Sequence, residues 1–415
     1  MIINGHVKEH RRLIIVTNIS FWERKIGAHE RIFRMASFLA SYGLDILIYY
    51  TGDKKIPNDY ENTLFSILSS KQLRSKIPKQ TALVFRVSGW LKEMTRVTKH
   101  LLKHRTPHET NHGSWHANIS EVDRYVFNQV VKKIEPHYIL VEYIWLTRFI
   151  TGLKYNLRQR LIAIIDTHDV ISDRTSQFDK ENRLLQQRAN VEQEAEALRH
   201  YDLIIAIQKH DAEKFRDMLP FGSVIIAHHA HPINSPVKAS DRKPIHLLFV
   251  GSQSAPNTDG LNLFLEHVWQ PLIDTYADDL ILHIVGSVSN NSADFYSRKN
   301  LIIHGMVDSV DEYYEKADIV IAPLTYGTGL KIKVVEALCF SKPLVTTNIG
   351  AEGLETARNQ AFLVADNWND FCLKTMALID STEQRNKMAQ SAYEFSNSMF
   401  TEAIAYKPLT DKLGL

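Results

Sequence analysis

The chain has 415 residues, of which 44% are hydrophobic and 23% are charged, and its formal net charge is +2. This length predicts two domains, and the near-average composition excludes disordered and collagen-like proteins. Because the charges nearly balance, no whole-protein field attracts the chain to nucleic acid, so no nucleic-acid partner is expected.

Cys339 and Cys372 are the only cysteines, too few for a disulfide framework or a cysteine-based zinc site. The basic start of the chain lacks the apolar run of a signal peptide, and no segment approaches the roughly 20 apolar residues of a membrane span. These features predict a cytoplasmic protein, with peripheral docking on the inner face of the cytoplasmic membrane as an open alternative.

Short apolar runs alternate with longer amphipathic stretches, a pattern typical of parallel strands covered by crossover helices. In the first half, strands are predicted at Leu13–Thr17, Asp45–Tyr50, Tyr138–Glu142, Leu161–Asp166, Leu203–Ile207 and Val224–Ala227. Helices are predicted there at Ala28–Tyr42 and Glu181–His200. The second half repeats the cycle with strands at His246–Val250, Leu280–Val285, Leu301–His304, Ile319–Pro323, Leu344–Thr347 and Phe362–Val364.

A proline-containing segment with few apolar residues separates the two halves and predicts a linker, with Pro232, Pro236 and Pro244. The expected fold is α/β, with two Rossmann-like, doubly wound domains at residues 1–236 and 237–395. Ligands of such sheets bind beyond the carboxyl ends of the strands, so we expect the site in the cleft between the domains.

A glycine-containing loop in the second half carries the clearest functional signal. Gly327 and Gly329 precede a helix predicted to begin near Leu330, whose free N–H groups and positive dipole end favour an anion. Lys331 and Lys333 add positive charge where the dipole disfavours it, which indicates an anionic ligand. Glu336 lies three residues after Lys333 on the same face, where it can accept hydrogen bonds from ribose hydroxyls. The pattern predicts a nucleoside diphosphate site, although a solvated Lys/Glu helix face has the same sequence.

The second half resembles the group 1 glycosyltransferases of GT-B fold, the large retaining family often called family 4, and especially its branch for bacterial surface polysaccharides. The resemblance runs in the family's order through FVGSQSAPNTDGLNLFLEHVWQPL, LHIVGS, IIHGMVDSVDEYYEKADIVIAPL, GTGLKIKVVEALCFSKPLVTT and NIGAEGL. Weaker matches in the first half are AHERIFRMASFLASYGLDI and IIDTHDVISDR. The family's fold also implies that residues 396–415 cross back onto the first domain.

The resemblance implies roles for several residues around this loop. Glu336 corresponds to the ribose-binding second acid of the family's E-x7-E motif, whereas Thr328 stands where the first acid would be. The loop from Gly251 to Asn257 lacks the family's Arg and Lys, so Lys331 and Lys333 are expected to neutralise the diphosphate. Donor contacts are also expected from Gly327, Gly329, Val307, Gly350 and Glu352.

The first domain is expected to contribute residues near the reacting sugar. His168 and Asp169 follow a predicted strand; the resemblance implies that His168 contacts the donor sugar, and we expect Asp169 to orient the acceptor. Arg174 is expected either to meet the phosphate or to pair with an acid, and Gly27 and Glu30 are placed near the acceptor or sugar. If the reaction is inverting, Asp169 or Glu30 would be the general base.

The resulting hypothesis is sugar transfer from a nucleotide-sugar to a saccharide or lipid-linked saccharide in bacterial surface polysaccharide synthesis, by the retaining reaction that the resemblance implies. No cofactor or metal is expected, His228, His229 and His231 are taken as structural, and UDP-, GDP- and dTDP-sugars cannot be distinguished. The alternatives are an inverting transferase, an epimerase or hydrolase of the same fold, and a non-catalytic sugar-nucleotide-binding subunit.

Residues 71–105 contain ten basic side chains and one acid, Glu93, a local charge of +9. Apolar residues recur there at helical spacing, including Trp90, Leu91 and Met94. A basic amphipathic helix of this kind either docks on an anionic membrane surface or packs its apolar stripe on the protein.

Overall fold

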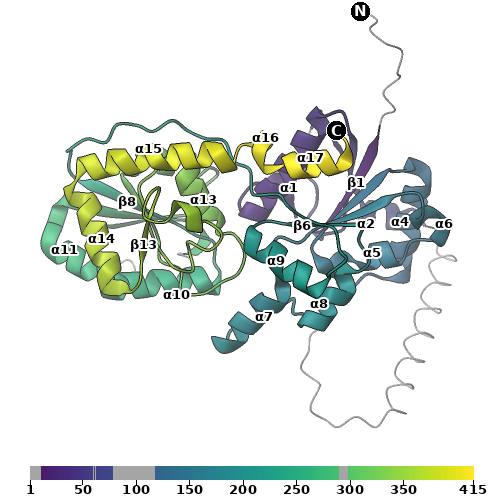
Figure 1. The fold of residues 1–415 in the computed structure, drawn as a ribbon, viewed down its shortest axis with the longest axis horizontal. Helices are drawn as coiled ribbons and strands as arrows, with labels where there is room; N and C mark the ends of the chain where they lie inside the picture. Colours follow the sequence, from purple (N-terminus) through teal and green to yellow (C-terminus); the bar gives the residue numbers. More distant parts are fainter. Residues whose placement is uncertain (1–10, 59, 61, 78–116, 289–297) are drawn as a thin grey trace, which may run out of the picture.

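The computed structural model describes residues 11–58, 60, 62–77, 117–288 and 298–415. Figure 1 shows two α/β lobes side by side, each built around one sheet. The first lobe holds the N-terminal half, and the last helices of the chain return to it from the second lobe (Figure 1).

The first sheet is parallel and has the strand order β3-β2-β1-β4-β5-β6-β7. Its strands are β1 (Arg12–Thr17), β2 (Asp45–Tyr50), β3 (Ser66–Ser69), β4 (Tyr138–Glu142), β5 (Ile162–Asp166), β6 (Leu203–Ala206) and β7 (Val224–Ile226). Its helices are α1 (Gly27–Ser41), α2 (Ser70–Ser75), α4 (Glu121–Ile134), α5 (Arg148–Thr151), α6 (Tyr155–Arg158), α7 (Ile171–Lys180), α8 (Val191–Leu198) and α9 (Lys209–Met218).

The second sheet is also parallel, with the order β10-β9-β8-β11-β12-β13. As in the first sheet, the first three strands in the sequence lie in reverse order across the sheet. The strands are β8 (Ile245–Val250), β9 (Leu280–Val285), β10 (Leu301–Gly305), β11 (Ile319–Ala322), β12 (Leu344–Thr347) and β13 (Leu363–Ala365). The helices are α10 (Ala255–Phe264), α11 (Gln270–Tyr276), α12 (Asp311–Lys316), α13 (Ile332–Cys339), α14 (Trp368–Asp380) and α15 (Thr382–Met399).

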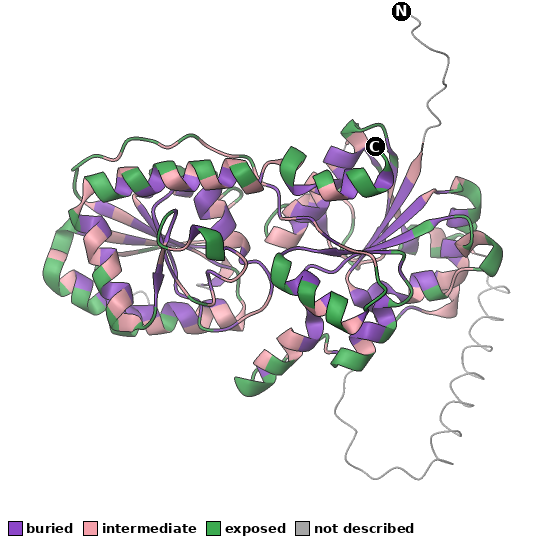
Figure 2. Cartoon of the chain, in the orientation of Figure 1, coloured by how far each residue is buried: buried purple, intermediate pink, exposed green. Residues whose placement is uncertain are grey.

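Both sheets are buried on both faces, and most helices expose one side only (Figure 2). Away from the edge strands β3 and β10, the strands are mostly continuous apolar runs, such as Ile14 to Val16 of β1, because crossover helices cover both faces of a parallel sheet. In each sheet the strand order reverses beside the first strand, and ligands of such sheets bind at that point. The two switch points are β1/β4 and β8/β11.

The end of the chain packs on the first lobe. Helices α16 (Glu402–Ala405) and α17 (Lys407–Leu413) follow α15, and Tyr406, Leu409 and Leu413 share a buried cluster with Leu13 of β1. The Tyr138 hydroxyl donates to the Leu413 carbonyl at 3.1 Å, which fixes the last helix against β4.

The structure corrects two details of the predicted elements. The predicted helix Glu181–His200 is wrong in its first half, because α7 ends at Lys180 and α8 begins only at Val191. Asn190 caps α8 by accepting from the Gln193 N–H, and Asn182 has a φ of 51°, so the chain turns between the two helices. Strand β3 was not predicted, since its sequence SILS has no apolar run.

Most of the basic segment lies outside the described residues, including everything from residue 78 to 105. Within the described part, Lys71 pairs with Asp53 at 2.7 Å and Arg74 pairs with Asp123 at 3.0 Å. No helix of the described residues is long and apolar enough to cross a membrane.

Candidate active site in the cleft between the lobes

A cavity of about 830 Å³ lies between the two lobes, at the carboxyl ends of strands from both sheets. The first lobe contributes Arg24, Gly27, Glu30, Arg34, Asp169 and Arg174 to its lining. The second contributes Gly251, Asn257, Val307, Gly327, Thr328, Lys331, Lys333 and Glu336. Residues predicted from both halves of the sequence are therefore brought together in one cleft.

The loop before α13 approaches the opposite lobe closely because of its glycines. Gly327 has a φ of 128° and Gly329 a φ of 71°, conformations that favour glycine. A Cβ at Gly329 would lie 3.0 Å from the Asp169 Cβ of the first lobe. The Gly327 N–H donates to the Gln177 side chain of α7 at 2.8 Å, so the loop is held by both lobes.

Lys333 extends from the first turn of α13 into the cleft. Its ammonium donates to the Asn257 side-chain oxygen and lies 5.0 Å from the centre of the Phe249 ring. Burial lowers the pKa of Lys333 to about 7. The loop from Gly251 to Asn257 has no cation of its own, but through Asn257 it holds this lysine beside the cavity.

Glu336 lines the cleft three residues after Lys333. The Tyr314 hydroxyl donates to its carboxylate at 3.1 Å, and burial raises the pKa of Glu336 to about 7. Near neutral pH both groups are therefore poised to change charge, and a bound ligand can select the ammonium and carboxylate forms.

Lys331 is already paired in this structure. Its ammonium donates to the Gly329 carbonyl at 2.6 Å and forms an ion pair with Glu352 at 2.9 Å. It is the N-cap residue of α13, which begins at Ile332, two residues later than predicted. Gly329, Gly350 and Glu352 are not among the residues that line the cleft, since Glu352 faces Lys331 and Gly350 packs on Thr346.

His168 lies behind the cleft surface and is not among its lining residues. Its Nε2 is 2.6 Å from a carboxylate oxygen of Glu142, and its ring stacks on Tyr143 with centroids 4.1 Å apart. Burial is the main cause that raises the pKa of Glu142, and the nearby charge of Asp166 raises it further. The sequence analysis missed Glu142; its one signal was an acid ending an otherwise apolar strand.

Glu142, Asp166 and His168 bring three potential metal ligands within 4.8 Å of one another. Arg31, however, donates to both oxygens of Asp166, at 2.6 and 2.8 Å, and this pair is almost wholly buried. The guanidinium already supplies the positive charge here, so these residues fit a hydrogen-bonded network better than a cation site.

Asp169 does reach the cleft, where it meets the second lobe. The Thr328 hydroxyl donates to its Oδ2 at 3.4 Å, and the Arg174 guanidinium lies 3.5 Å from the same oxygen. The other oxygen, Oδ1, is buried without a hydrogen-bond partner among the described residues. A buried carboxylate oxygen without a partner is uncommon in folded proteins, and this one belongs to a residue that lines the cavity.

Glu30 is held by two arginines at the rim. Arg24 binds both of its carboxylate oxygens, at 2.5 and 2.7 Å, and Arg34 lies 3.0 Å from one of them. Sequence reasoning missed both arginines, although they flank Gly27 in the segment WERKIGAHERIFR. Gly27 itself packs directly against Ile332 of α13. A Cβ at position 27 would lie 2.5 Å from that side chain, so this close contact requires glycine.

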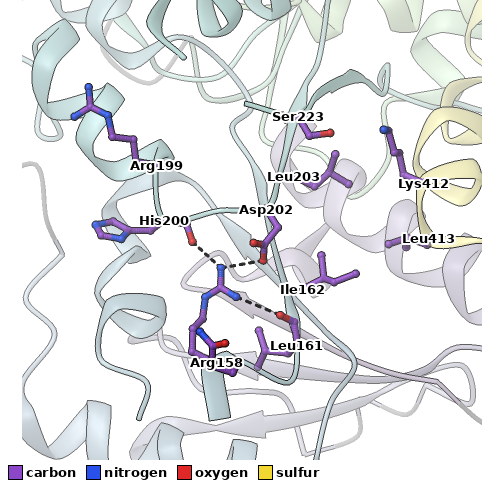
Figure 3. A pocket seen from close by; sticks show the side chains of 11 residues that line it. Arg158, Leu161, Ile162, Arg199, His200, Asp202, Leu203, Ser223, Lys412 and Leu413 are labelled. Atoms are coloured by element: carbon purple, nitrogen blue, oxygen red, sulfur yellow. Dashed lines mark hydrogen bonds and ion pairs between the residues drawn. The ribbon is translucent and has the colours of Figure 1, made fainter. Parts of the chain in front are cut away.

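A second cavity, of about 700 Å³, lies at the opposite ends of β5 and β6. Arg158 is held there by Asp202 at 2.9 Å and by the carbonyls of Leu161 and His200, each at 3.2 Å. Figure 3 shows the side chains of Arg199 and His200 extending away from this group. The cations of this cavity do not converge on one point.

Residues 244–381 match the family model of the glycosyl transferases group 1. A protein of Klebsiella pneumoniae, "Uncharacterized 44.6 kDa protein in cps region", is 26% identical over 206 residues. That alignment covers 46% of this chain and 50% of the Klebsiella protein, about half of its length.

Solved structures share the whole two-lobed fold at low identity. A TarM variant from S. aureus, in complex with fondaparinux, alpha-GlcNAc-glycerol and UDP, matches with a TM-score of 0.69 at 8% identity, over 97% of this chain and 99% of TarM. HepE from Anabaena, in complex with UDP and glucose, matches with a TM-score of 0.62 at 12% identity, over 98% of this chain and 100% of HepE. The predicted fold of two Rossmann-like domains facing a cleft, GT-B, is confirmed.

Proposed function

We propose that this chain, whose residues 244–381 belong to the group 1 glycosyltransferases, transfers a sugar from a nucleotide-sugar to a saccharide or lipid-linked saccharide acceptor. The observation that carries the proposal is the pairing of Lys333 and Glu336 on one face of α13 inside the cleft. The lysine suits a diphosphate and the carboxylate suits ribose hydroxyls, as the sequence predicts.

The diphosphate would lie over the start of α13. Lys333 is the cation of this helix that is not already in an ion pair, and diphosphate binding would restore its full positive charge. Lys331 also lines the cleft, but because it is bonded to Gly329 and Glu352 its main role would be to hold the loop that surrounds the phosphate. Arg24 and Arg174 line the cleft from the opposite lobe, where each is already paired with a carboxylate, Glu30 and Asp169 respectively.

The reacting sugar would lie beside Thr328 and Asp169, where the lobes meet. Thr328 offers a hydroxyl where the family's motif has a carboxylate, and the free Oδ1 of Asp169 offers an acceptor for a hydroxyl. His168 would act indirectly, by supporting this side of the cleft. It bonds to Glu142, and its ring stacks on Tyr143. In a retaining transfer the leaving phosphate takes the acceptor proton, and the protein positions the reactants and stabilises the charge that develops.

An inverting transfer is the second candidate, favoured by the unpartnered oxygen of Asp169. A general base must lie within hydrogen-bond reach of the acceptor hydroxyl with a lone pair available. Glu30 meets this requirement less well, because Arg24 and Arg34 already bind its carboxylate. The stereochemistry of the product, read by NMR from the anomeric proton coupling, distinguishes the two reactions.

The relatives support a proposal for the biological setting. The Klebsiella protein is named for a cps region, and the TarM and HepE structures hold UDP, so we propose a UDP-sugar and a role in surface polysaccharide synthesis. A calorimetric screen of nucleoside diphosphates, followed by an acceptor screen with the matching sugar nucleotides, tests the proposal. The expected result is one preferred nucleotide and a glycosylated acceptor; a nucleotide that binds but never gives product would indicate a non-catalytic binding subunit.

A further inference from the structure

His231 lines the cleft, although the sequence suggested only a structural role for it. It lies in the segment that leads from β7 to the second lobe, and its backbone N–H donates to the Phe400 carbonyl at 2.9 Å. Its imidazole Nδ1 lies 2.8 Å from the carbonyl oxygen of Pro232. These two bonds hold the main chain and the ring of His231 at the wall of the cleft.

The bond to Pro232 determines which ring nitrogen carries the proton. A carbonyl oxygen can only accept a hydrogen bond, so Nδ1 of His231 is the donor of this pair. Burial lowers the pKa of the His231 imidazole, so the ring is neutral at neutral pH. A neutral ring with its proton on Nδ1 has a lone pair on Nε2. Within the described part of the chain no group bonds to this nitrogen, so it is an acceptor without a protein partner.

The position of the ring relative to α13 indicates which part of a ligand it meets. Lys333, Glu336 and Phe340 follow one another at spacings of three and four residues, so they share one face of α13 and its C-terminal end. All three line the cleft. The His231 ring packs against Phe340 with centroids 5.6 Å apart. Because four helical residues rise about 6 Å, His231 lies about one turn beyond Glu336, on the side away from Lys333.

We propose that His231 Nε2 accepts a hydrogen bond from a ribose hydroxyl of the bound nucleotide, and that it thereby selects ribonucleotides. The inference rests on the proposed function, which places the diphosphate at Lys333 and the ribose at Glu336. The ionised diphosphate oxygens are acceptors and offer nothing to a lone pair, whereas a hydroxyl can donate to it. The Glu336 carboxylate and His231 Nε2 are both acceptors, so together they match the two adjacent hydroxyls of one ribose. A site built to bond a hydroxyl rejects the analogue that lacks it.

The charges around His231 favour a neutral partner over an anion. Arg34 and Glu30 of α1 form an ion pair at 3.0 Å and largely cancel. Asp311, the first residue of α12, lines the same cavity from the second lobe and adds a negative charge. All three groups influence the pKa of the imidazole, but burial has the largest effect and keeps the ring neutral. A ribose hydroxyl suits these surroundings better than a phosphate does.

Calorimetry of the full chain with UDP and with 2′,3′-dideoxy-UDP tests the proposal, because the second nucleotide lacks both ribose hydroxyls. The wild-type protein is expected to bind UDP more tightly. His231→Phe keeps a ring against Phe340 but removes the lone pair. Its UDP affinity should fall about 3- to 10-fold, the range for one neutral hydrogen bond, while its affinity for the dideoxy nucleotide stays unchanged. His231→Gln, whose amide oxygen can take the place of Nε2, should keep most of the preference for UDP.

His228→Phe is the matched control. His228 makes the same kind of bond, from Nδ1 to the Ile207 carbonyl at 3.0 Å, but it is not among the residues that line the cleft. This variant should leave both affinities unchanged, and circular dichroism shows whether each variant is folded.

A crystal structure with UDP provides a readout that needs no variant. It is expected to show His231 Nε2 within about 3.2 Å of a ribose oxygen. A longer distance, or equal losses for both nucleotides in folded His231→Phe, would overturn the proposal and leave His231 as a structural or base-contacting residue. A wild-type protein that binds neither nucleotide would instead overturn the proposed function, and this inference with it.

Discussion

At the scale of single residues, the charge of Lys333 decides how the cleft responds to phosphate. With a pKa of about 7, lowered by burial, Lys333 loses its proton as the pH rises above 7, whereas a diphosphate binds the protonated form. Between pH 7 and 9 the affinity for a nucleoside diphosphate should therefore fall, by up to about tenfold per unit. Calorimetry of the diphosphate and of the nucleoside alone checks this, since the nucleoside controls for the titration of Glu336.

A matched variant isolates the lysine. Lys333→Arg keeps its charge over this whole range, so its diphosphate affinity should no longer fall as the pH rises, and only the dependence caused by Glu336 should remain. A wild-type affinity that stays constant from pH 7 to 9 would mean that Lys333 does not meet the phosphate.

Glu336 should contribute a hydrogen bond to ribose in its charged form. Replacing Glu336 by Ala is expected to weaken nucleotide binding by about 1.5 to 3 kcal/mol, the range for hydrogen bonds to charged groups. Tyr314→Phe removes the hydroxyl that holds the carboxylate and should cost less, about 0.5 to 1.5 kcal/mol. Calorimetry measures both losses; wild-type affinity in Glu336→Ala would remove this residue from the site.

At the scale of elements, the contact between α1 and α13 sets how closely the lobes approach. A methyl group at Gly27 would lie 2.5 Å from Ile332, so Gly27→Ala should push the two helix ends apart and weaken nucleotide binding. Ile332→Gly removes every side-chain atom that a Cβ at position 27 would meet, and the Gly27→Ala, Ile332→Gly double variant should recover part of the affinity lost in Gly27→Ala. A double-mutant cycle measures this coupling, and strictly additive losses would contradict a direct contact.

The buried Arg31 ties three elements of the first lobe together. It binds Asp166 at the end of β5 and donates to the carbonyls of Ala227 and His228, just after β7. Because Arg31→Met leaves the Asp166 carboxylate buried and unpaired, the variant should lower the free energy of unfolding by about 3 to 5 kcal/mol. Urea denaturation measures this, with Lys407→Met, which breaks an exposed ion pair, as a control expected to change little.

At the scale of the whole molecule, the architecture is predictable from the sequence because buried parallel strands are continuous apolar runs. The edge strand β3 escaped prediction for the same reason, since its SILS segment is half polar. The site was predictable where residues are neighbours in sequence, as with Lys333 and Glu336. Contacts between residues far apart in the sequence were not predictable. The hydrogen bond between Glu142 and His168 and the ion pair between Glu352 and Lys331 are therefore seen only in the structure.

The basic segment at residues 71–105 makes a separate prediction about where the protein works. If it docks on a membrane, the full chain should sediment with vesicles of anionic lipid at low salt and be released as salt shortens the Debye length. Changing Lys92, Arg96, Lys99 and Lys103 to Glu should abolish this binding without changing nucleotide affinity. Vesicle binding that persists in this variant would exclude the segment as the anchor.

The central claim is that the cleft transfers a sugar to an acceptor, and nucleotide release with and without acceptor saccharides tests it most directly. The predicted result is release that accelerates when the correct acceptor is present, is matched by glycosylated product, and falls strongly in Glu336→Ala. Release at the same rate without any acceptor would indicate a hydrolase or epimerase. Tight nucleotide binding with no release under any acceptor would contradict the proposed activity.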